Sequence, residues 1–280
     1  MKRLFVLAAA ALAGLAGCAS PAGVAQPEVS FAPADLVLQV RSSGGFVPVE
    51  LTVTALPELS VYGDGRVITT GPVPAIYPGP ALPNVQVQHI ARADVQALAR
   101  RARQAGVGGG ADLGIPSVAD APSTRITVRT AEGVAVTDAP ALGIGDGTGL
   151  TDAQRAARRR LEDLVTALRD LPKTLGDGAI DRPVAYEPAL IAAVARPWAP
   201  ASDGLPADPP PIAWPGPALP GPAVPDRPGV ACLTAEAAPV LSAAKGANSR
   251  TPWTSGDQRW AVEFRPLLPG ESSCADLTAR

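Results

Sequence analysis

Proline is concentrated in one part of this chain, and that concentration constrains the fold more than any other feature. Twelve prolines fall within the 32 residues 197–228. Each proline fixes its own φ angle and lacks the amide N–H that helices and sheets use. We therefore predict an extended, polyproline-like linker at residues 197–228, which separates a larger unit at residues 35–196 from a smaller unit at residues 229–280.

The larger unit has the pattern of short strands joined by turns. Val49, Leu51 and Val53 alternate with polar residues, and this period of two predicts a half-buried strand at residues 49–55. Comparable patterns predict further strands at residues 36–40, 60–62, 66–68, 85–90, 124–130, 134–136 and 184–195. Short strands joined by tight turns pair in the antiparallel sense.

A glycine-flanked aspartate joins two of these strands. Gly63-Asp64-Gly65 lies between residues 60–62 and 66–68, and its Asp-Gly pair predicts a type I′ turn with positive φ angles. We interpret Asp64 as a residue chosen for backbone geometry and not as a catalytic carboxylate.

Helices are predicted in both units. One runs from Asp94, as its N-cap, to Gln104, and the next runs from Thr151 to Leu171, where Thr151 and Gln154 have capping-box spacing. The smaller unit is predicted to hold strands at residues 230–233 and 259–264 and a helix at residues 235–244. The fold class is therefore α+β, with mainly antiparallel sheet and two or three helices.

The N-terminus has the layout of a secretory signal. Lys2 and Arg3 precede thirteen uncharged residues, fewer than the roughly 20 that a membrane-spanning helix needs. The run ends in Leu15-Ala16-Gly17-Cys18, which looks like a bacterial lipobox, the motif at which a diacylglyceryl group is attached to the cysteine sulfur. We expect a signal peptide at residues 1–17 and a lipidated flexible tether at residues 18–34. The alternative is an ordinary signal peptide with a chance cysteine.

Lipid at Cys18 would place the protein on the outer, extracytoplasmic face of the cell membrane. Two acyl chains are enough for stable anchoring, whereas one chain is marginal. Without residues 1–17 the chain has 22 basic and 26 acidic residues, a net charge of −4, so there is no electrostatic case for nucleic-acid binding.

The other two cysteines, Cys232 and Cys274, form an even pair in an oxidising compartment, which predicts a structural disulfide. The alternative is a redox or metal pair. The chain has one histidine, His89, which is interpreted as a packed or edge residue of its strand, so no zinc site is predicted.

Sequence signatures of catalysis are weak. Ser242 and Lys245 have the S-x-x-K spacing of penicillin-binding enzymes, but the accompanying S-D-N and K-T-G elements are absent from the sequence. The glycine-rich residues 143–149 lack the order of a phosphate-binding loop. No catalytic residue, metal or cofactor is therefore predicted.

One hexapeptide occurs twice. Pro-Gly-Pro-Ala-Leu-Pro stands at residues 78–83 after Tyr77 and again at residues 215–220 after Trp214. Each copy precedes a predicted strand, helix and strand, so the repeat indicates either an old duplication or chance in a chain rich in these residues. Tyr77 and Trp214 are the candidate binding surface, although tryptophans beside proline also commonly cover a small core.

Several motifs resemble those of a known group. Residues 45–48 (GFVP), 56–68 (LPELSVYGDGRVI), 77–83 (YPGPALP) and 264–271 (FRPLLPGE) are similar to segments of uncharacterised actinobacterial lipoproteins. The resemblance implies a place in an actinobacterial cell envelope and brings no known activity or site residues with it.

These observations favour a lipid-anchored, non-catalytic protein that binds an envelope ligand or protein. The alternative is an envelope hydrolase or transferase that uses carboxylates or the pair Ser242 and Lys245. A deep pocket in which those groups converge would favour the enzyme, and a shallow apolar patch around Tyr77 and Trp214 would favour binding.

Overall fold

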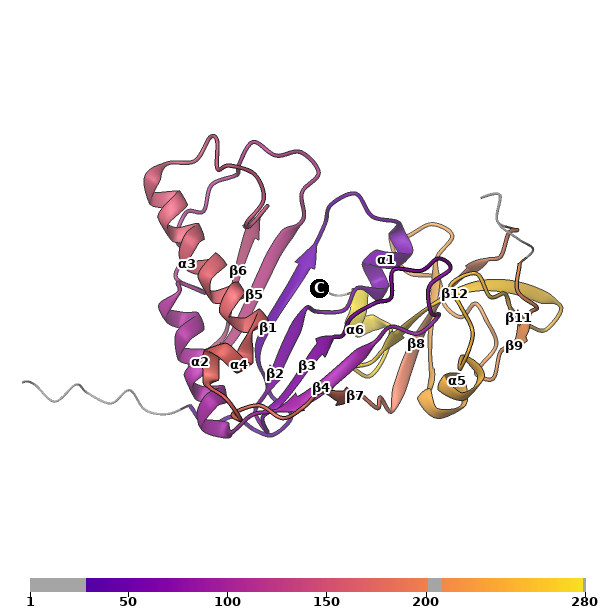
Figure 1. Ribbon diagram of the computed structural model, residues 1–280. Helices are drawn as coiled ribbons and strands as arrows, with labels where there is room; N and C mark the ends of the chain where they lie inside the picture. The colour runs from indigo at the N-terminus through magenta and orange to yellow at the C-terminus, as the bar shows by residue number, and fades with distance from the viewer. Residues whose placement is uncertain (1–28, 201–207, 279–280) are drawn as a thin grey trace, which may run out of the picture.

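The computed structural model describes residues 29–200 and 208–278, and within them twelve strands form two sheets (Figure 1). Pairing is antiparallel except between two short strands of the second sheet. Six helices accompany the sheets in the same residues. The fold class is α+β with mainly antiparallel sheet, as the sequence predicts.

The first sheet has seven strands in the order β6-β5-β1-β2-β3-β4-β7. Its strands are β1 (Leu36–Ser43), β2 (Leu59–Tyr62), β3 (Arg66–Thr70), β4 (Val85–His89), β5 (Ser123–Thr130), β6 (Gly133–Pro140) and β7 (Val184–Ala185). Val40 of β1 pairs with Leu59 of β2 and with Ile126 of β5, so all three apolar side chains lie on one face.

Two long helices, α2 (Arg92–Gln104) and α3 (Asp152–Arg169), cover that apolar face, and the short α4 (Leu171–Leu175) follows (Figure 1). Their buried residues recur at helical spacing, which gives each helix one apolar side against the sheet. The resulting core includes Val95, Leu98, Ala102, Leu161, Leu164 and Leu168.

The second sheet has the order β10-β8-β12-β11-β9. Its strands are β8 (Leu190–Pro197), β9 (Ile212–Ala213), β10 (Ala231–Glu236), β11 (Trp253–Ser255) and β12 (Gln258–Pro266), and the helices in this part are α5 (Ala237–Ala243) and α6 (Ala275–Thr278). Trp253 contacts Trp214 and Phe264 edge to face, with ring centroids 5.9 and 5.3 Å apart. These three rings form the centre of this core.

Residues 49–54 form a helix, α1 (Val49–Thr54), and the predicted strand at residues 49–55 is wrong. A six-residue segment is too short for its periodicity to distinguish the two structures. Val53 is buried in a cluster with residues of the second sheet, and the Glu50 carboxylate lies 3.4 Å from Arg196. Tertiary packing therefore overrides the β propensity of the valines.

The turn between β2 and β3 also differs from the predicted type I′ turn. Gly65 is the only residue of 63–65 with positive φ, at +97°, and its N–H donates to Tyr62 O at 3.0 Å. This is a three-residue hairpin loop. A Cβ on Gly63 would lie 2.1 Å from Ala32 O, so that glycine permits close chain approach. The Asp64 carboxylate accepts from the backbone and side chain of Arg66.

The predicted helix starts have different outcomes. The N-cap of α2 is Ala91, and Asp94 lies inside the first turn, so the predicted cap is wrong. The capping box of α3 is confirmed: Gln154 N–H donates to Thr151 Oγ1 at 3.2 Å, and Thr151 N–H donates to Gln154 Oε1 at 2.8 Å.

The chain passes between the two sheets near Tyr186. The predicted strand at residues 184–195 is in fact two strands, because β7 belongs to the first sheet and β8 to the second. The change of sheet therefore falls before residue 197. Residues 208–228 of the predicted linker pack onto the second sheet through β9, Trp214 and Leu219.

The two copies of the hexapeptide meet the same core. Leu219 of the second copy is buried beside Trp214, and Ala81 and Leu82 of the first copy pack against the same cluster. Ala81 N–H donates to Ala247 O at 3.1 Å. This hydrogen bond joins the segment before β4 to the loop between α5 and β11.

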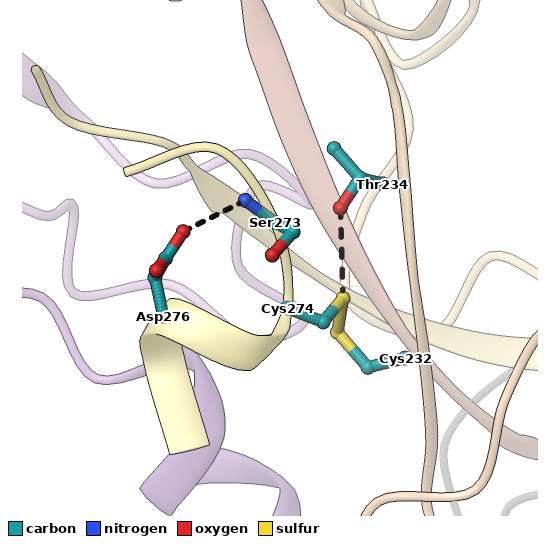
Figure 2. Close-up of a disulfide and its surroundings, with 5 residues drawn as sticks. All are labelled: Cys232, Thr234, Ser273, Cys274 and Asp276. Carbon is teal, nitrogen blue, oxygen red and sulfur yellow. Dashed lines mark hydrogen bonds between the residues drawn. A yellow bond between two sulfur atoms is a disulfide. The ribbon is translucent and has the colours of Figure 1, made fainter. Parts of the chain in front are cut away.

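The predicted disulfide is confirmed. Cys232 of β10 bonds to Cys274, with the Cα atoms 6.0 Å apart, and the Thr234 hydroxyl donates to Cys274 Sγ at 3.8 Å (Figure 2). Asp276 accepts from the N–H of Ser273 at 3.1 Å, so the segment around α6 is held to β10 by a covalent bond and ordered by a local hydrogen bond.

Candidate functional site

The two residues of the predicted binding surface lie in different environments. Tyr77 is 66% exposed, whereas Trp214 is 8% exposed and its indole N–H donates to Pro217 O at 2.6 Å. The expectation for Trp214 is corrected accordingly: its ring is part of the core and is not presented to a ligand. Cys18 lies outside the described residues.

The residues of the predicted enzyme alternative do not form a site with each other. Ser242 is near the end of α5, and Lys245 is exposed after it. The Lys245 backbone N–H donates to Ser242 O at 3.4 Å. This spacing is one turn of helix. His89 is exposed at the end of β4, opposite Arg66.

Two carboxylates do come together near α1. Glu50 pairs with Arg196, and burial raises the pKa of Glu263 on β12, with the Arg196 charge opposing this shift and the Glu50 charge adding to it. A carboxyl group with a raised pKa is a candidate general acid. Neither Glu50 nor Glu263 lines any of the four larger cavities of the described residues.

Among residues 29–200 and 208–278 there is no group of three or more His, Cys, Asp or Glu that could hold a metal ion. No helix in the same part of the chain is long and apolar enough to cross a membrane.

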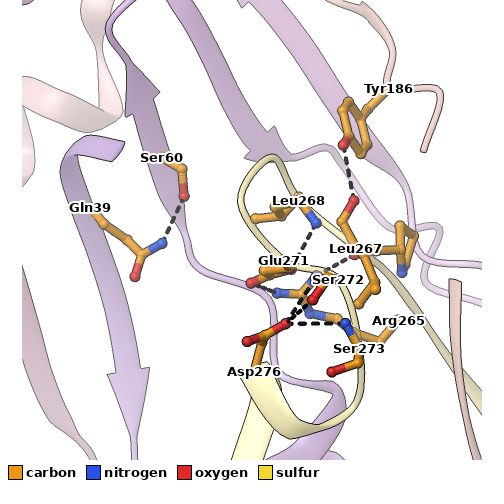
Figure 3. A network of polar contacts seen from close by, with 11 residues as sticks. Gln39, Ser60, Tyr186, Arg265, Leu267, Leu268, Glu271, Ser272, Ser273 and Asp276 are labelled. Atoms are coloured by element: carbon orange, nitrogen blue, oxygen red, sulfur yellow. Dashed lines mark hydrogen bonds and ion pairs between the residues drawn. The ribbon is translucent and has the colours of Figure 1, made fainter. Parts of the chain in front are cut away.

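A buried polar cluster lies between the sheets (Figure 3). Arg265 and Glu271 form an ion pair at 3.0 Å, Glu271 also accepts from Leu268 N–H at 2.7 Å, and Tyr186 donates to Leu267 O at 2.9 Å. Burial raises the pKa of Tyr62 well above its usual value, and the Glu271 charge adds to this. The adjoining cavity of about 10 Å³ holds at most one water, so the cluster is structural.

The arginines at the start of α3 are also structural. Arg158 is 4% exposed, and its guanidinium donates to Pro140 O at 2.7 Å and Ala141 O at 2.8 Å. Arg155 pairs with Asp152 at 2.6 Å. A cavity of about 250 Å³ lies between these side chains and the glycine-rich loop, residues 143–149. The two carbonyls that Arg158 binds, of Pro140 and Ala141, lie just before that loop.

Exposed apolar side chains gather on two loops, residues 44–48 and 71–77, which we name the distal loops. They contain Phe46 (96% exposed), Val47, Val73, Ile76 and Tyr77. One loop follows the end of β1 and the other follows the end of β3, and both strands are antiparallel to β2. The two loops therefore leave the same end of the sheet, from strands about 10 Å apart.

A basic cavity lies at the other end of β1, and we name it the tether-end cavity. Its volume is about 500 Å³, and Val29, the first described residue, lies in its wall. The cavity is lined by α2 and the β5–β6 turn, through Val29, Phe31, Gln96, Ala99, Arg100, Arg103, Gln104, Arg129, Thr130, Ala131 and Glu132. Arg129 Nε donates to Leu36 O at 3.3 Å, which fixes the cavity beside the start of β1.

The sequence predicts Tyr77 of the distal loops as a binding residue, but it does not predict the other distal residues or the tether-end cavity. Residues 44–48 are predicted only as a break between strands. The signal that could have identified the loop is Phe46, an apolar residue between a glycine pair and Pro48. The cavity could not be predicted, because Arg129 joins Arg100 and Arg103 through the placement of β5 beside α2.

Comparison of the chain with models of protein families, with curated proteins and with solved structures finds no match.

Proposed function

We propose that this protein is held on the outer face of the cell membrane by lipid at Cys18 and acts there by binding an envelope ligand or protein, without catalysis. The observation that carries the proposal is the position of the exposed apolar distal loops, at the opposite end of β1 from Val29. About 25 Å of strand separates the two ends.

The attachment end of the folded part is defined by Val29. Gln96 Nε2 donates to Val29 O, so the chain is fixed to α2 at this point. Val29 follows Cys18 by eleven residues, and a span of that length reaches at most about 40 Å when extended. An anchor at Cys18 therefore keeps this end close to the membrane and leaves the distal loops free to face outward.

The distal loops have the properties of a contact surface. Large apolar side chains grouped on one surface are a common mark of protein or ligand binding. Prolines in residues 71–83 restrict the backbone, which lowers the entropy lost on binding. The partner is accordingly expected to present an apolar surface. The resemblance to actinobacterial lipoproteins agrees with this placement in the envelope.

Two measurements test the proposal. Fractionation of cells that express the full chain should find it in the membrane with a covalently bound acyl group, and Cys18→Ser should abolish acylation. Thermal unfolding of the full chain in detergent, against envelope glycans, peptidoglycan fragments and lipids, should give a higher Tm with one class, because a ligand that binds only the native state stabilises it.

Variants of the distal loops make the second measurement specific. Phe46→Ser and Tyr77→Ser should remove the Tm shift, whereas Val184→Ser, at an apolar position on β7 that is 58% exposed, should keep it. A shift that survives both distal substitutions would place binding elsewhere, and turnover of the bound compound would favour the enzyme alternative.

A further inference from the structure

We propose that the tether-end cavity binds the phosphate group of an anionic phospholipid in the membrane that carries the anchor. The inference deepens the proposed function and rests on it, because lipid at Cys18 is what brings this cavity to a membrane surface. It adds a second, reversible contact between protein and membrane.

The charge of the cavity fits a phosphate. Three arginines, Arg100, Arg103 and Arg129, line it together with one glutamate, Glu132, and the nearby Asp35 carboxylate opposes Arg129, so the local formal charge is +1 in a mature chain of net charge −4. Arg129 also lies 3.8 Å from Asp35, at the edge of the site. Guanidinium groups bind phosphate oxygens through paired, charge-assisted hydrogen bonds.

The elements that hold these arginines are rigid. Arg100 and Arg103 are exposed on the last turns of α2, whose Leu98, Ala99 and Ala102 are buried against the sheet. Arg129 projects from β5, which pairs with β1 and β6 on its two sides. The backbone at these three positions is therefore fixed before any ligand arrives, which reduces the cost of binding.

The position of the cavity identifies the occupant as a lipid of the same membrane. The described chain begins in the cavity wall at Val29, eleven residues after Cys18. The anchor thus confines the three arginines to within about 40 Å of the lipid headgroups. Each arginine near an anionic surface strengthens membrane binding by roughly fivefold.

The experiment uses the full lipoprotein in two kinds of vesicle, phosphatidylcholine alone and phosphatidylcholine with 30% phosphatidylglycerol, a lipid fraction of about one third chosen for a strong anionic surface. Flotation measures attachment, and amide hydrogen exchange measures protection of residues 96–104 and 129–132. We expect exchange there to slow by about fivefold or more on the anionic vesicles. High salt should remove this protection.

Matched variants distinguish phosphate binding in the tether-end cavity from a general electrostatic attraction of the protein to the anionic surface. Arg100→Glu with Arg103→Glu should abolish the protection, and Arg100→Gln with Arg103→Gln should weaken it with a smaller charge change. Arg159→Glu with Arg160→Glu changes the same charge at exposed positions of α3 and should keep it. Amide exchange of residues 96–104 and 129–132 that is equal on the two kinds of vesicle would overturn the proposal. So would a loss of protection in the α3 variant equal to that in the α2 variant.

Failure of the anchor gives a different result. An unacylated protein would not float with phosphatidylcholine vesicles, and this would overturn the lipid attachment in the proposed function. If that protein still floated with the anionic vesicles in a manner dependent on Arg100 and Arg103, the phosphate site would be supported by itself. If it floated with neither, both ideas would fall. Inorganic phosphate at millimolar concentration that competes fully would assign the site to free phosphate instead.

Discussion

Arg265 and Glu271 form an ion pair, with Nη2 and Oε1 3.0 Å apart, in which each side chain is only 2% exposed. The pair closes the loop that follows β12, and this loop places Leu268 in a cluster with Tyr62, Ile68 and Val85 of the first sheet. Through Leu268, the loop after β12 of the second sheet packs against the face of the first sheet that α2 and α3 do not cover.

Glu271→Gln should strongly destabilise the protein, because it leaves the Arg265 guanidinium buried without its carboxylate. Removing one partner of a buried ion pair costs about 3–5 kcal/mol. Urea unfolding measures this change in the free energy of unfolding. Glu236→Gln, at an exposed position before α5, is the control and should change it by less than about 0.5 kcal/mol. A loss below about 1 kcal/mol for Glu271→Gln would contradict a strong role for the pair.

Removal of the disulfide should also destabilise the fold. In the chain-entropy model, a bond that closes the 42-residue separation between Cys232 and Cys274 contributes about 4 kcal/mol. The double substitution to Ala should lower Tm and speed amide exchange in residues 272–278, where the bond holds α6. The wild-type protein under full reduction should behave in the same way. Unchanged exchange in that segment would show that packing alone holds it.

Alkaline pH should weaken the fold through two buried tyrosines. Burial raises the pKa of Tyr62 and of Tyr186, whereas unfolded tyrosines ionise near pH 10. Above about pH 10 the unfolded state therefore binds fewer protons than the folded state, and stability falls as pH rises. Each group contributes a slope of at most about 1.4 kcal/mol per pH unit.

Urea unfolding between pH 9 and 11 tests this slope. Tyr62→Phe should make the fall in the free energy of unfolding with pH shallower, by a difference that approaches about 1.4 kcal/mol per pH unit near pH 11, whatever its effect at neutral pH. An unchanged slope in this variant would show that Tyr62 ionises equally in both states.

Thr151→Ala should destabilise the protein by about 1 kcal/mol, because it removes the side-chain acceptor that caps α3. The change is measurable as a lower Tm. Thr166→Ala, at an exposed position within the same helix, should be neutral or slightly stabilising. Equal effects of the two substitutions would mean that the capping box makes no specific contribution.

Local chemistry made part of this fold predictable. The capping box at Thr151 and Gln154 depends on residues three apart, and helix α3 begins where they predict. The pairing of Cys232 with Cys274 followed from an even pair of cysteines. In these cases the interacting groups are neighbours in sequence or have one partner to choose, so distant parts of the chain do not alter the outcome.

Other elements depend on contacts that sequence does not reveal. Val53 reads equally well as a strand or helix residue, and its burial against the second sheet decides for the helix α1. Trp214 beside proline is compatible with either a binding surface or a small core, and its packing after β9 decides for the core. The tether-end cavity likewise requires α2 to lie against β5, which brings Arg103 and Arg129 into the wall of one cavity.

The fastening of Leu268 onto the first sheet has a consequence for how the protein is made. Tyr62, Ile68 and Val85 leave the ribosome roughly 180 to 210 residues before Leu268 does. At about 5–20 residues per second, these side chains wait on the order of ten seconds or longer for the segment that covers them. A nascent chain with such a delay exposes an apolar patch throughout its synthesis. Its yield should therefore depend on chaperones that shield this patch until the C-terminus is complete.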